Sequence, residues 1–181
     1  MTRLFVALQL PETLRQAISQ LGAGIRGARW LDPDDIHLTL RFIGDVDGAD
    51  FRDIHQALDN LRSEPFELYL SGVGHFPPRG TPRTLWIGVQ ENDSLVRLQR
   101  RVDQTLMRLG HASEHRKYKA HVTVARLQQG TPINRIRTFL VEHSLLRFEP
   151  FLVDEFCLYS SQLHPDGARY TVEECYGLGM A

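Results

Sequence analysis

Alternating apolar strands and apolar helical stripes follow one another in two similar series along the chain. The first series predicts a strand at 4–8, a helix after Pro11 that extends to Ile25, a strand at His37, a helix around 54–61 and a strand at 66–73. A Pro- and Gly-rich turn at 77–82 follows. The second series predicts a strand at 84–89, a helix with caps at 92–94, a strand at His121, a helix starting at Pro132, and strands at 148–159 and 170–176.

Equivalent positions of the two series are separated by nearly constant distances along the chain. Phe5 precedes Trp86 by 81 positions, and Phe66 precedes Phe151 by 85 positions. Two units are too few for a solenoid, so the repeat favours a pair of similar α+β lobes. We therefore predict one bilobed domain spanning residues 1–181, built from approximate repeats at 1–80 and 81–181.

A tetrapeptide with the pattern His-x-Thr-x occurs once in each series, at 37–40 and, 84 positions later, at 121–124. Residues i and i+2 of a strand point to the same face, so each copy presents an imidazole beside a hydroxyl. One such copy is most simply a structural feature of a strand, but an equivalent copy in the second series favours a function. Two imidazoles suit general acid and base catalysis near neutral pH, and hydroxyls donate to phosphoryl oxygens. We predict an active site for phosphoester chemistry at His37, Thr39, His121 and Thr123.

The composition restricts the partners and the compartment. The chain has 181 residues, a formal net charge of −1 and a pI near 6.7, which argues against non-specific affinity for long nucleic acids or anionic membranes. Its two cysteines, Cys157 and Cys175, lack zinc-site spacing and are interpreted as packing residues of a reduced protein. Pro11 ends the first apolar run before a signal-peptide core could form. We expect a cytoplasmic protein without membrane or metal partners.

Six segments of the chain resemble one known family. They lie at 1–11, 37–44, 72–76, 85–89, 121–126 and 158–161. Together with the duplicated His-x-Thr-x motif, they make the chain similar to the RNA 2′,3′-cyclic phosphodiesterases, the LigT-like proteins once called 2′-5′ RNA ligases, of the 2H phosphoesterase superfamily. One departure is Ala120, where the family usually has proline. The resemblance implies an α+β, bilobed, pseudo-two-fold fold with two mainly antiparallel sheets and outer helices around a central cleft.

The resemblance also implies a reaction. This reaction is the metal-independent hydrolysis of an RNA 2′,3′-cyclic phosphodiester end to a 2′-phosphomonoester, without a cofactor. By this analogy His37 is the proton donor to the departing 3′ oxygen, and His121 is the proton acceptor from the attacking water. Thr39 and Thr123 then hold the non-bridging phosphate oxygens.

Four further residues are candidate substrate contacts. Arg126 corresponds to an arginine that lies near the phosphate in the family, although strict alternation puts it on the face opposite His121 unless the strand bulges. Tyr118 and Lys119 belong to a basic run that suits contact with RNA, or else forms a solvated loop. Phe42 lies at an even spacing from Leu38 and Leu40, so strict alternation puts it on the same buried face of the strand. This favours a place in the core over a platform for a base.

Three other functions are compatible with these residues. The same side chains can run the reverse reaction and join RNA ends through a 2′-5′ linkage, or they can act on a small cyclic nucleotide. A module that binds RNA ends without turnover is a further alternative, but lysine or arginine would serve such binding better than paired histidines. We expect a monomer whose partner is an RNA or oligonucleotide with a 2′,3′-cyclic phosphate end.

Overall fold

The structure, a computed structural model, describes residues 1–22, 24–113, 116–165 and 167–179. The α-helices in these ranges are α1 (Glu12–Ser19), α2 (Gly48–Asp59), α3 (Asp93–Arg108) and α4 (Ile133–Glu142), and a 3₁₀ turn, η1, spans Pro33–Asp35. The strands are β1 (Thr2–Gln9), β2 (Ala28–Trp30), β3 (His37–Val46), β4 (Phe66–Leu68), β5 (Leu70–Phe76), β6 (Thr84–Val89), β7 (His121–Leu127), β8 (Phe151–Val153), β9 (Glu155–His164) and β10 (Gly167–Gly177). No helix in the described ranges is long and apolar enough to cross a membrane.

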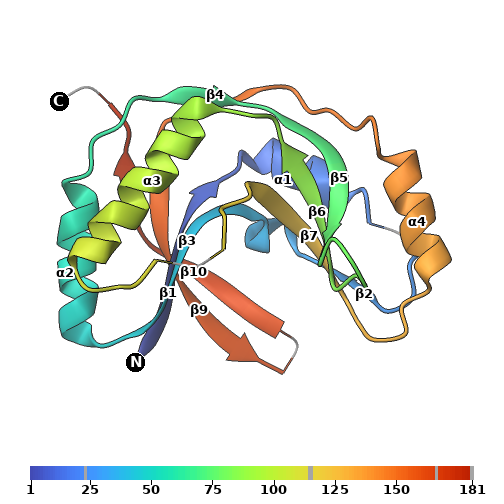
Figure 1. The fold of residues 1–181 in the computed structure, drawn as a ribbon, viewed down its shortest axis with the longest axis horizontal. Coiled ribbons are helices and arrows are strands. Elements are labelled where there is room, and N and C mark those ends of the chain that lie inside the picture. Colours follow the sequence, from blue (N-terminus) through green and yellow to red (C-terminus); the bar gives the residue numbers. More distant parts are fainter. Residues whose placement is uncertain (23, 114–115, 166, 180–181) are drawn as a thin grey trace.

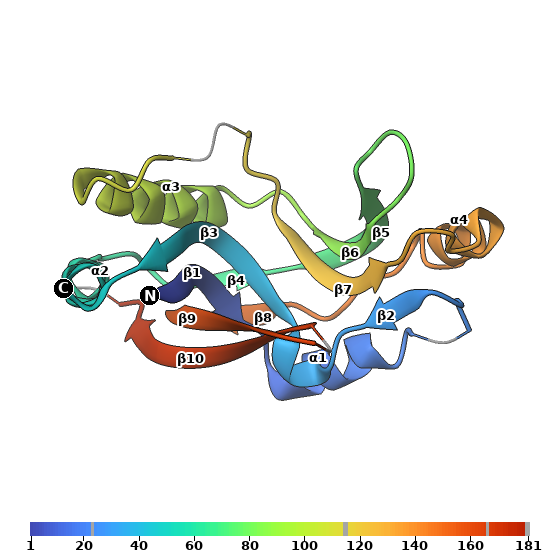
Figure 2. The same ribbon diagram turned by 90° about the horizontal axis from the view of Figure 1, so that it is seen from below.

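Most of the strands form one large antiparallel sheet that has two parts. Strands β10, β9, β1 and β3 are neighbours in that order in the first part, and β7, β6 and β5 continue it, with β2 also paired to β7. Strands β4 and β8 form a separate two-stranded sheet. Figure 1 shows α2 and α3 at one end of the molecule and α4 at the other, and Figure 2 shows β3 and β7 between these ends. The predicted α+β class and the antiparallel pairing are confirmed.

Strand β1 lies in the middle of the first part of the sheet and is buried on both faces. Leu4, Val6 and Leu8 contribute to the main core, whereas Phe5 and Ala7 face a smaller cluster. A strand that is covered on both faces is apolar without alternation, which explains the run at 4–8. The other members of the smaller cluster are Cys157, Tyr159, Tyr170 and Cys175.

The chain between α1 and β3 differs from the prediction. Helix α1 ends at Ser19 rather than at Ile25, which is buried outside the helix. Gly24 and Gly27 have positive φ angles of 78° and 84°, a conformation that interrupts a helix and favours glycine. The chain then adds β2 to the edge of β7, and this three-residue strand is too short for a period of two to be recognised in the sequence.

Two predicted strands are each divided in the structure. The segment 66–73 forms β4 and most of β5, and the segment 148–159 contains β8 and the first half of β9. In both cases the first strand pairs in the small sheet, while the second pairs in the large sheet. Each strand is divided where it changes its pairing partner, and the apolar pattern along the chain does not reveal the position of that change.

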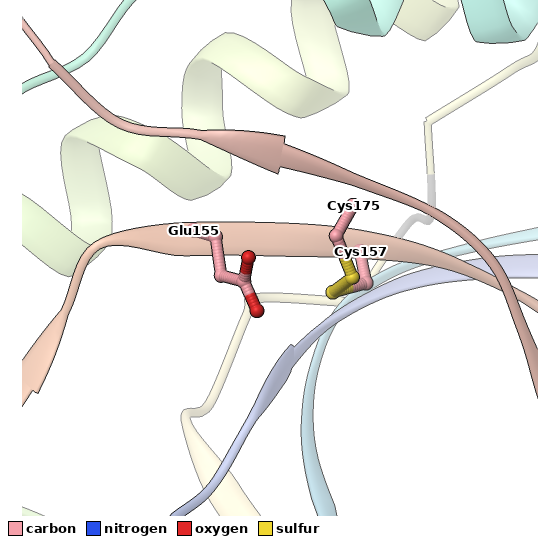
Figure 3. A group of neighbouring side chains, drawn as sticks. All are labelled: Glu155, Cys157 and Cys175. Carbon is pink, nitrogen blue, oxygen red and sulfur yellow. A yellow bond between two sulfur atoms is a disulfide. The ribbon is translucent and has the colours of Figure 1, made fainter.

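The two cysteines form a disulfide, which corrects their interpretation as separate packing residues of a reduced protein. Cys157 on β9 is the direct ladder partner of Cys175 on β10, and Figure 3 shows the bond between their sulfur atoms. Glu155 lies beside them, but sulfur atoms bonded to each other are not thiolate ligands, so this group is not a metal site in the disulfide state. The pairing depends on the register of two strands, which the cysteine spacing alone does not contain.

A buried ion pair ties the loop after α3 to the central strand β3. The guanidinium of Arg41, only 5% exposed, donates to Asp103 of α3 at 2.6 Å. It also donates to the carbonyl oxygens of Phe42 and Ala112, and the hydroxyl of Ser113 donates to Asp103 at 2.8 Å. This network satisfies a buried charge and holds together β3, α3 and the start of the segment that leads to β7.

Removal of the buried guanidinium is predicted to destabilise the fold strongly. Arg41→Leu leaves the Asp103 carboxylate without its cation and lowers the free energy of unfolding by roughly 3 to 5 kcal/mol, measured by urea denaturation. Arg3→Leu is the matched control, because the side chains of its ion pair with Asp45 are 52% and 51% exposed and such a pair contributes at most about 1 kcal/mol. Equal losses for the two variants would contradict the importance of the buried network.

Candidate functional site

The two His-x-Thr-x motifs meet where the two parts of the large sheet join. Strands β3 and β7 are antiparallel and share one described ladder pair, Leu38 with Val122. Both side chains of this pair are buried, so the residues before and after them in each strand point to the opposite face. The antiparallel register puts each histidine level with the threonine of the other motif. The four predicted catalytic residues, all partly exposed on one face of this junction, are His37, Thr39, His121 and Thr123.

A β-bulge in β3 changes the face of the residues after the first motif. The ladder with β1 skips Leu40, and both Leu40 and Arg41 are buried. Phe42 consequently joins the face of His37 and is 54% exposed. Its ring centroid lies 5.8 Å from that of Phe5, which also contacts His37. The preference for Phe42 in the core is therefore wrong, because it counted the alternation straight through a bulge.

An equivalent bulge in β7 acts in the same way after the second motif. The ladder with β6 skips Val124, and both Val124 and Ala125 are buried. Arg126 consequently shares the face of Thr123, and its guanidinium donates to the Thr84 hydroxyl at 3.4 Å. The structure thus contains the bulge on which the predicted reach of Arg126 depends.

Each motif histidine is held by the same backbone contact. Nδ1 of His37 lies 2.8 Å from the carbonyl oxygen of Asp35, and Nδ1 of His121 lies 2.7 Å from that of Lys119. A carbonyl oxygen only accepts a hydrogen bond, so Nδ1 carries the proton in both rings. Nε2 is then the nitrogen that can exchange a proton with a substrate, and it is the same nitrogen in both motifs.

Aromatic side chains surround His37. Its ring centroid lies 4.9 Å from Phe5, 5.0 Å from Tyr170 and 5.7 Å from Tyr159. Burial raises the pKa of Tyr159 to about 12, so this residue presents a neutral hydroxyl. None of these three neighbours is among the site residues predicted from the sequence, and the available signal was that Phe5 and Tyr159 lie in segments that resemble the family. No periodicity reveals that rings from three strands face one histidine.

His121 has aromatic neighbours from the second part of the sheet. Its ring centroid lies 4.8 Å from that of Phe76, in an edge-to-face arrangement, and 6.4 Å from that of Trp86. The ammonium of Lys119 is 4.5 Å from the Trp86 ring centroid and 5.5 Å from that of Phe76. These cation–π contacts hold the predicted candidate Lys119 beside His121.

The site favours neutral imidazoles in the absence of an anion. Burial lowers the pKa of His37 to about 4, with smaller contributions from the charges of Arg126 and His121, while the hydrogen bond to Asp35 opposes the shift. Burial also lowers the pKa of His121, and the charges of Lys119 and Arg126 act in the same direction. The charge of Arg126 therefore acts on both rings. A bound anion would raise both pKa values, because it stabilises an imidazolium.

Tyr118 connects the two motifs through the segment before β7. Its hydroxyl donates to the carbonyl oxygen of Thr39 at 3.2 Å, and burial raises its pKa. The hydroxyl therefore has a partner within the protein, and the predicted contact of Tyr118 with RNA stays a prediction.

The site is a partly exposed face of the sheet, and two cavities elsewhere in the described structure do not include it. Two cavities of about 430 and 540 Å³ lie beside the end of α2 and α3, and neither is lined by a motif residue. The candidate site therefore rests on the duplicated motif and not on either of these cavities.

Known proteins similar in sequence cover almost the whole chain. The sequence model of the family described as LigT like Phosphoesterase matches residues 8–86 and, a second time, residues 87–170. The RNA 2′,3′-cyclic phosphodiesterase of Archaeoglobus fulgidus is 33% identical, over 93% of this chain and 96% of its own length. That of Thermotoga maritima is 31% identical, over 94% of this chain and 92% of its own length.

Solved structures share the fold. The crystal structure of TT0787 of Thermus thermophilus has a TM-score of 0.82 at 27% identity, with 97% of each chain covered. The crystal structure of E. coli LigT complexed with 3′-AMP has a TM-score of 0.80 over 99% of each chain, and at 24% identity this likeness concerns the fold alone. Since the family model matches both halves and full-length relatives exceed 30% identity, this chain belongs to the LigT-like phosphoesterase family.

Proposed function

We propose that this protein hydrolyses RNA 2′,3′-cyclic phosphodiester ends to 2′-phosphomonoesters. The relatives from A. fulgidus and T. maritima carry the name RNA 2′,3′-cyclic phosphodiesterase. The observation that carries the proposal is the junction of β3 and β7, where two histidines with the same free nitrogen lie beside two threonines. Such a pair of histidines can serve one phosphorus atom as proton acceptor and proton donor.

In the proposed reaction, Nε2 of His121 takes a proton from a water molecule, and the water oxygen attacks the phosphorus atom. The bond from phosphorus to the ribose 3′ oxygen breaks, and Nε2 of His37 donates the proton that this oxygen requires. The phosphate stays on the 2′ oxygen. This scheme needs no metal ion or cofactor, since the acid, the base and the phosphate donors are all side chains.

The remaining predicted residues are assigned to the phosphate and the base. The hydroxyls of Thr39 and Thr123 are proposed to donate to the non-bridging oxygens, where negative charge increases in the transition state. Arg126 is proposed to add a positive charge beside them. Phe42 offers an exposed ring on which a base can stack, and Lys119 offers a charge for an RNA phosphate.

The proposed role of His37 as the acid requires a proton that the free protein does not hold at neutral pH. The pKa of His37 is lowered to about 4 and that of His121 is lowered as well, which leaves both rings neutral. The cyclic phosphodiester is an anion, and its arrival beside the rings raises both pKa values. Substrate binding therefore prepares the acid, and the two rings titrate as a pair with two apparent pKa values.

An RNA oligonucleotide that ends in a 2′,3′-cyclic phosphate tests the reaction directly. The expected product, identified by phosphorus NMR, is the 2′-phosphomonoester, because the 3′ oxygen is the proposed leaving group. The rate is expected to be unchanged in EDTA. A 3′-phosphate, or loss of activity in EDTA, would overturn the mechanism. A 2′-5′-linked product as the main species would replace hydrolysis by ligation, and binding without turnover would favour a recognition module.

Replacement of either motif histidine is predicted to remove most of the activity. His37→Gln and His121→Gln each lose an acid or base function that contributes roughly 10²- to 10⁴-fold to kcat. His143→Gln is the matched control, because its Nδ1 also contacts a backbone carbonyl, that of Phe139 at 2.9 Å, at the end of α4. Circular dichroism checks the fold of each variant. Near-normal turnover by either motif variant would exclude the paired mechanism.

The pH dependence is predicted to differ between the free and the substrate-bound protein. Both limbs of the pH profile of kcat are expected at higher pH than the limbs of the kcat/KM profile. The kcat/KM profile reports the free protein, in which burial and the charge of Arg126 lower the pKa values of both histidines. Arg126→Gln removes a positive charge and is expected to move the kcat/KM limbs to higher pH. Limbs that stay in place or move to lower pH would contradict this electrostatic coupling.

A further inference from the structure

Two arginines face each other across the β2–β7 ladder. Arg29, the middle residue of the three-residue strand β2, is the direct partner of Arg126 on β7. Directly opposite residues of an antiparallel pair project from the same face, and like charges in such positions destabilise a sheet. An unfavourable arrangement of this kind beside a candidate active site points to a ligand of opposite charge.

Both arginines lie on the face of the sheet that carries the motifs. The neighbours of Arg29 in β2, Ala28 and Trp30, pack against the main core, so Arg29 projects from the opposite face and is exposed. Arg126 is exposed on the face of Thr123, beyond the bulge in β7. Neither arginine belongs to one of the ion pairs found within the described ranges.

The guanidinium of Arg29 also lies close to the elements that hold His37. It packs against Gly167 at the start of β10, where a Cβ atom would collide with it. Burial raises the pKa of the Asp35 carboxyl, and the charges of Arg169 and Arg29 oppose this rise, which places both arginines near η1. The carbonyl of Asp35 is the group that holds the His37 ring. Arg29 therefore stands beside the first motif while it pairs with the strand of the second.

We propose that Arg29 and Arg126 bind a second phosphate of the substrate, the internal phosphodiester next to the cyclic end. This inference rests on the proposed function, in which the histidines and threonines hold the cyclic phosphate. Arg126 is then shared between the two phosphates, and Arg29 contacts the internal one alone. Arg126 is two ladder steps from Thr123, roughly 7 Å along the strand, so the two guanidiniums reach a neighbouring phosphate while the cyclic one stays at the motifs. A guanidinium matches phosphate oxygens, and a bound anion offsets the repulsion between the arginines. The substrate class is thus an oligonucleotide rather than a cyclic mononucleotide.

Three substrates separate this contact from the reaction itself. They are adenosine 2′,3′-cyclic phosphate, an adenosine dinucleotide with a 2′,3′-cyclic end, and the same dinucleotide with an uncharged methylphosphonate in place of its internal phosphodiester. We expect kcat/KM of the wild-type protein to be about tenfold higher for the charged than for the uncharged dinucleotide, the size of one charge-assisted contact. Arg29→Gln is expected to remove this preference. It is also expected to make the slope of log kcat/KM against log salt concentration, measured with the charged dinucleotide, shallower by about 0.7.

The control is Arg137→Gln, which removes an exposed arginine of α4 and is expected to keep the full preference for the charged dinucleotide. An Arg29→Gln variant that still prefers the charged dinucleotide tenfold would overturn the inference.

Hydrolysis of the cyclic mononucleotide reports the proposed function separately, because this substrate has no internal phosphate. If the wild-type protein turns over none of the three substrates, the proposed function fails. Calorimetry then measures the affinity of the wild-type protein and of Arg29→Gln for the charged and the uncharged dinucleotide. If the ratio of these two affinities is the same in both proteins, the role of Arg29 is overturned.

Discussion

The pairing of Leu38 with Val122 is the contact on which the candidate site depends. It joins strands from the two halves of the chain, so one antiparallel pair sets both the separation and the direction of the two motifs. Both residues are fully buried, which ties this register to the packing of the main core. A shift of one residue in either strand would turn its histidine and threonine to the other face and separate them from the second pair. The hydrophobic core therefore positions polar groups that it does not contain.

The bulges that follow the motifs extend this arrangement to Phe42 and Arg126. Leu40 and Val124 are the extra residues, and they are 84 positions apart, like the motifs themselves. The equivalent bulges support the internal duplication predicted from the sequence, which stays a prediction. Each bulge exposes one residue on the site face, but the chemistry differs, since the bulge in β3 exposes Phe42 and the bulge in β7 exposes Arg126. The exposed residue is thus an aromatic ring after the first motif and a cation after the second.

The electrostatics of the site are unfavourable until an anion is present. Burial disfavours a charge on His37, while Arg126 and Lys119 add positive charge to the same small region. Natural proteins accept such local costs at functional sites and offset them elsewhere. Here the offsetting stability includes the Arg41 network, in which a buried guanidinium donates to a carboxylate and to two backbone carbonyls within the protein. Arg41 is thus a cation that stabilises the fold, whereas Arg126 and Lys119 are exposed cations whose charge is available to a ligand.

The sequence by itself determined the α+β order of elements, the two His-x-Thr-x strands and the chemistry of their side chains, because the period of two and the character of imidazole and hydroxyl groups are local properties. The tertiary structure alone decided that Phe42 faces the site, that Arg126 reaches it, that Arg29 pairs with Arg126 and that Cys157 meets Cys175. Each of these outcomes depends on which residue of a neighbouring strand stands opposite. A bulge or a register is a relation between two segments distant in sequence, and no pattern within one segment records it.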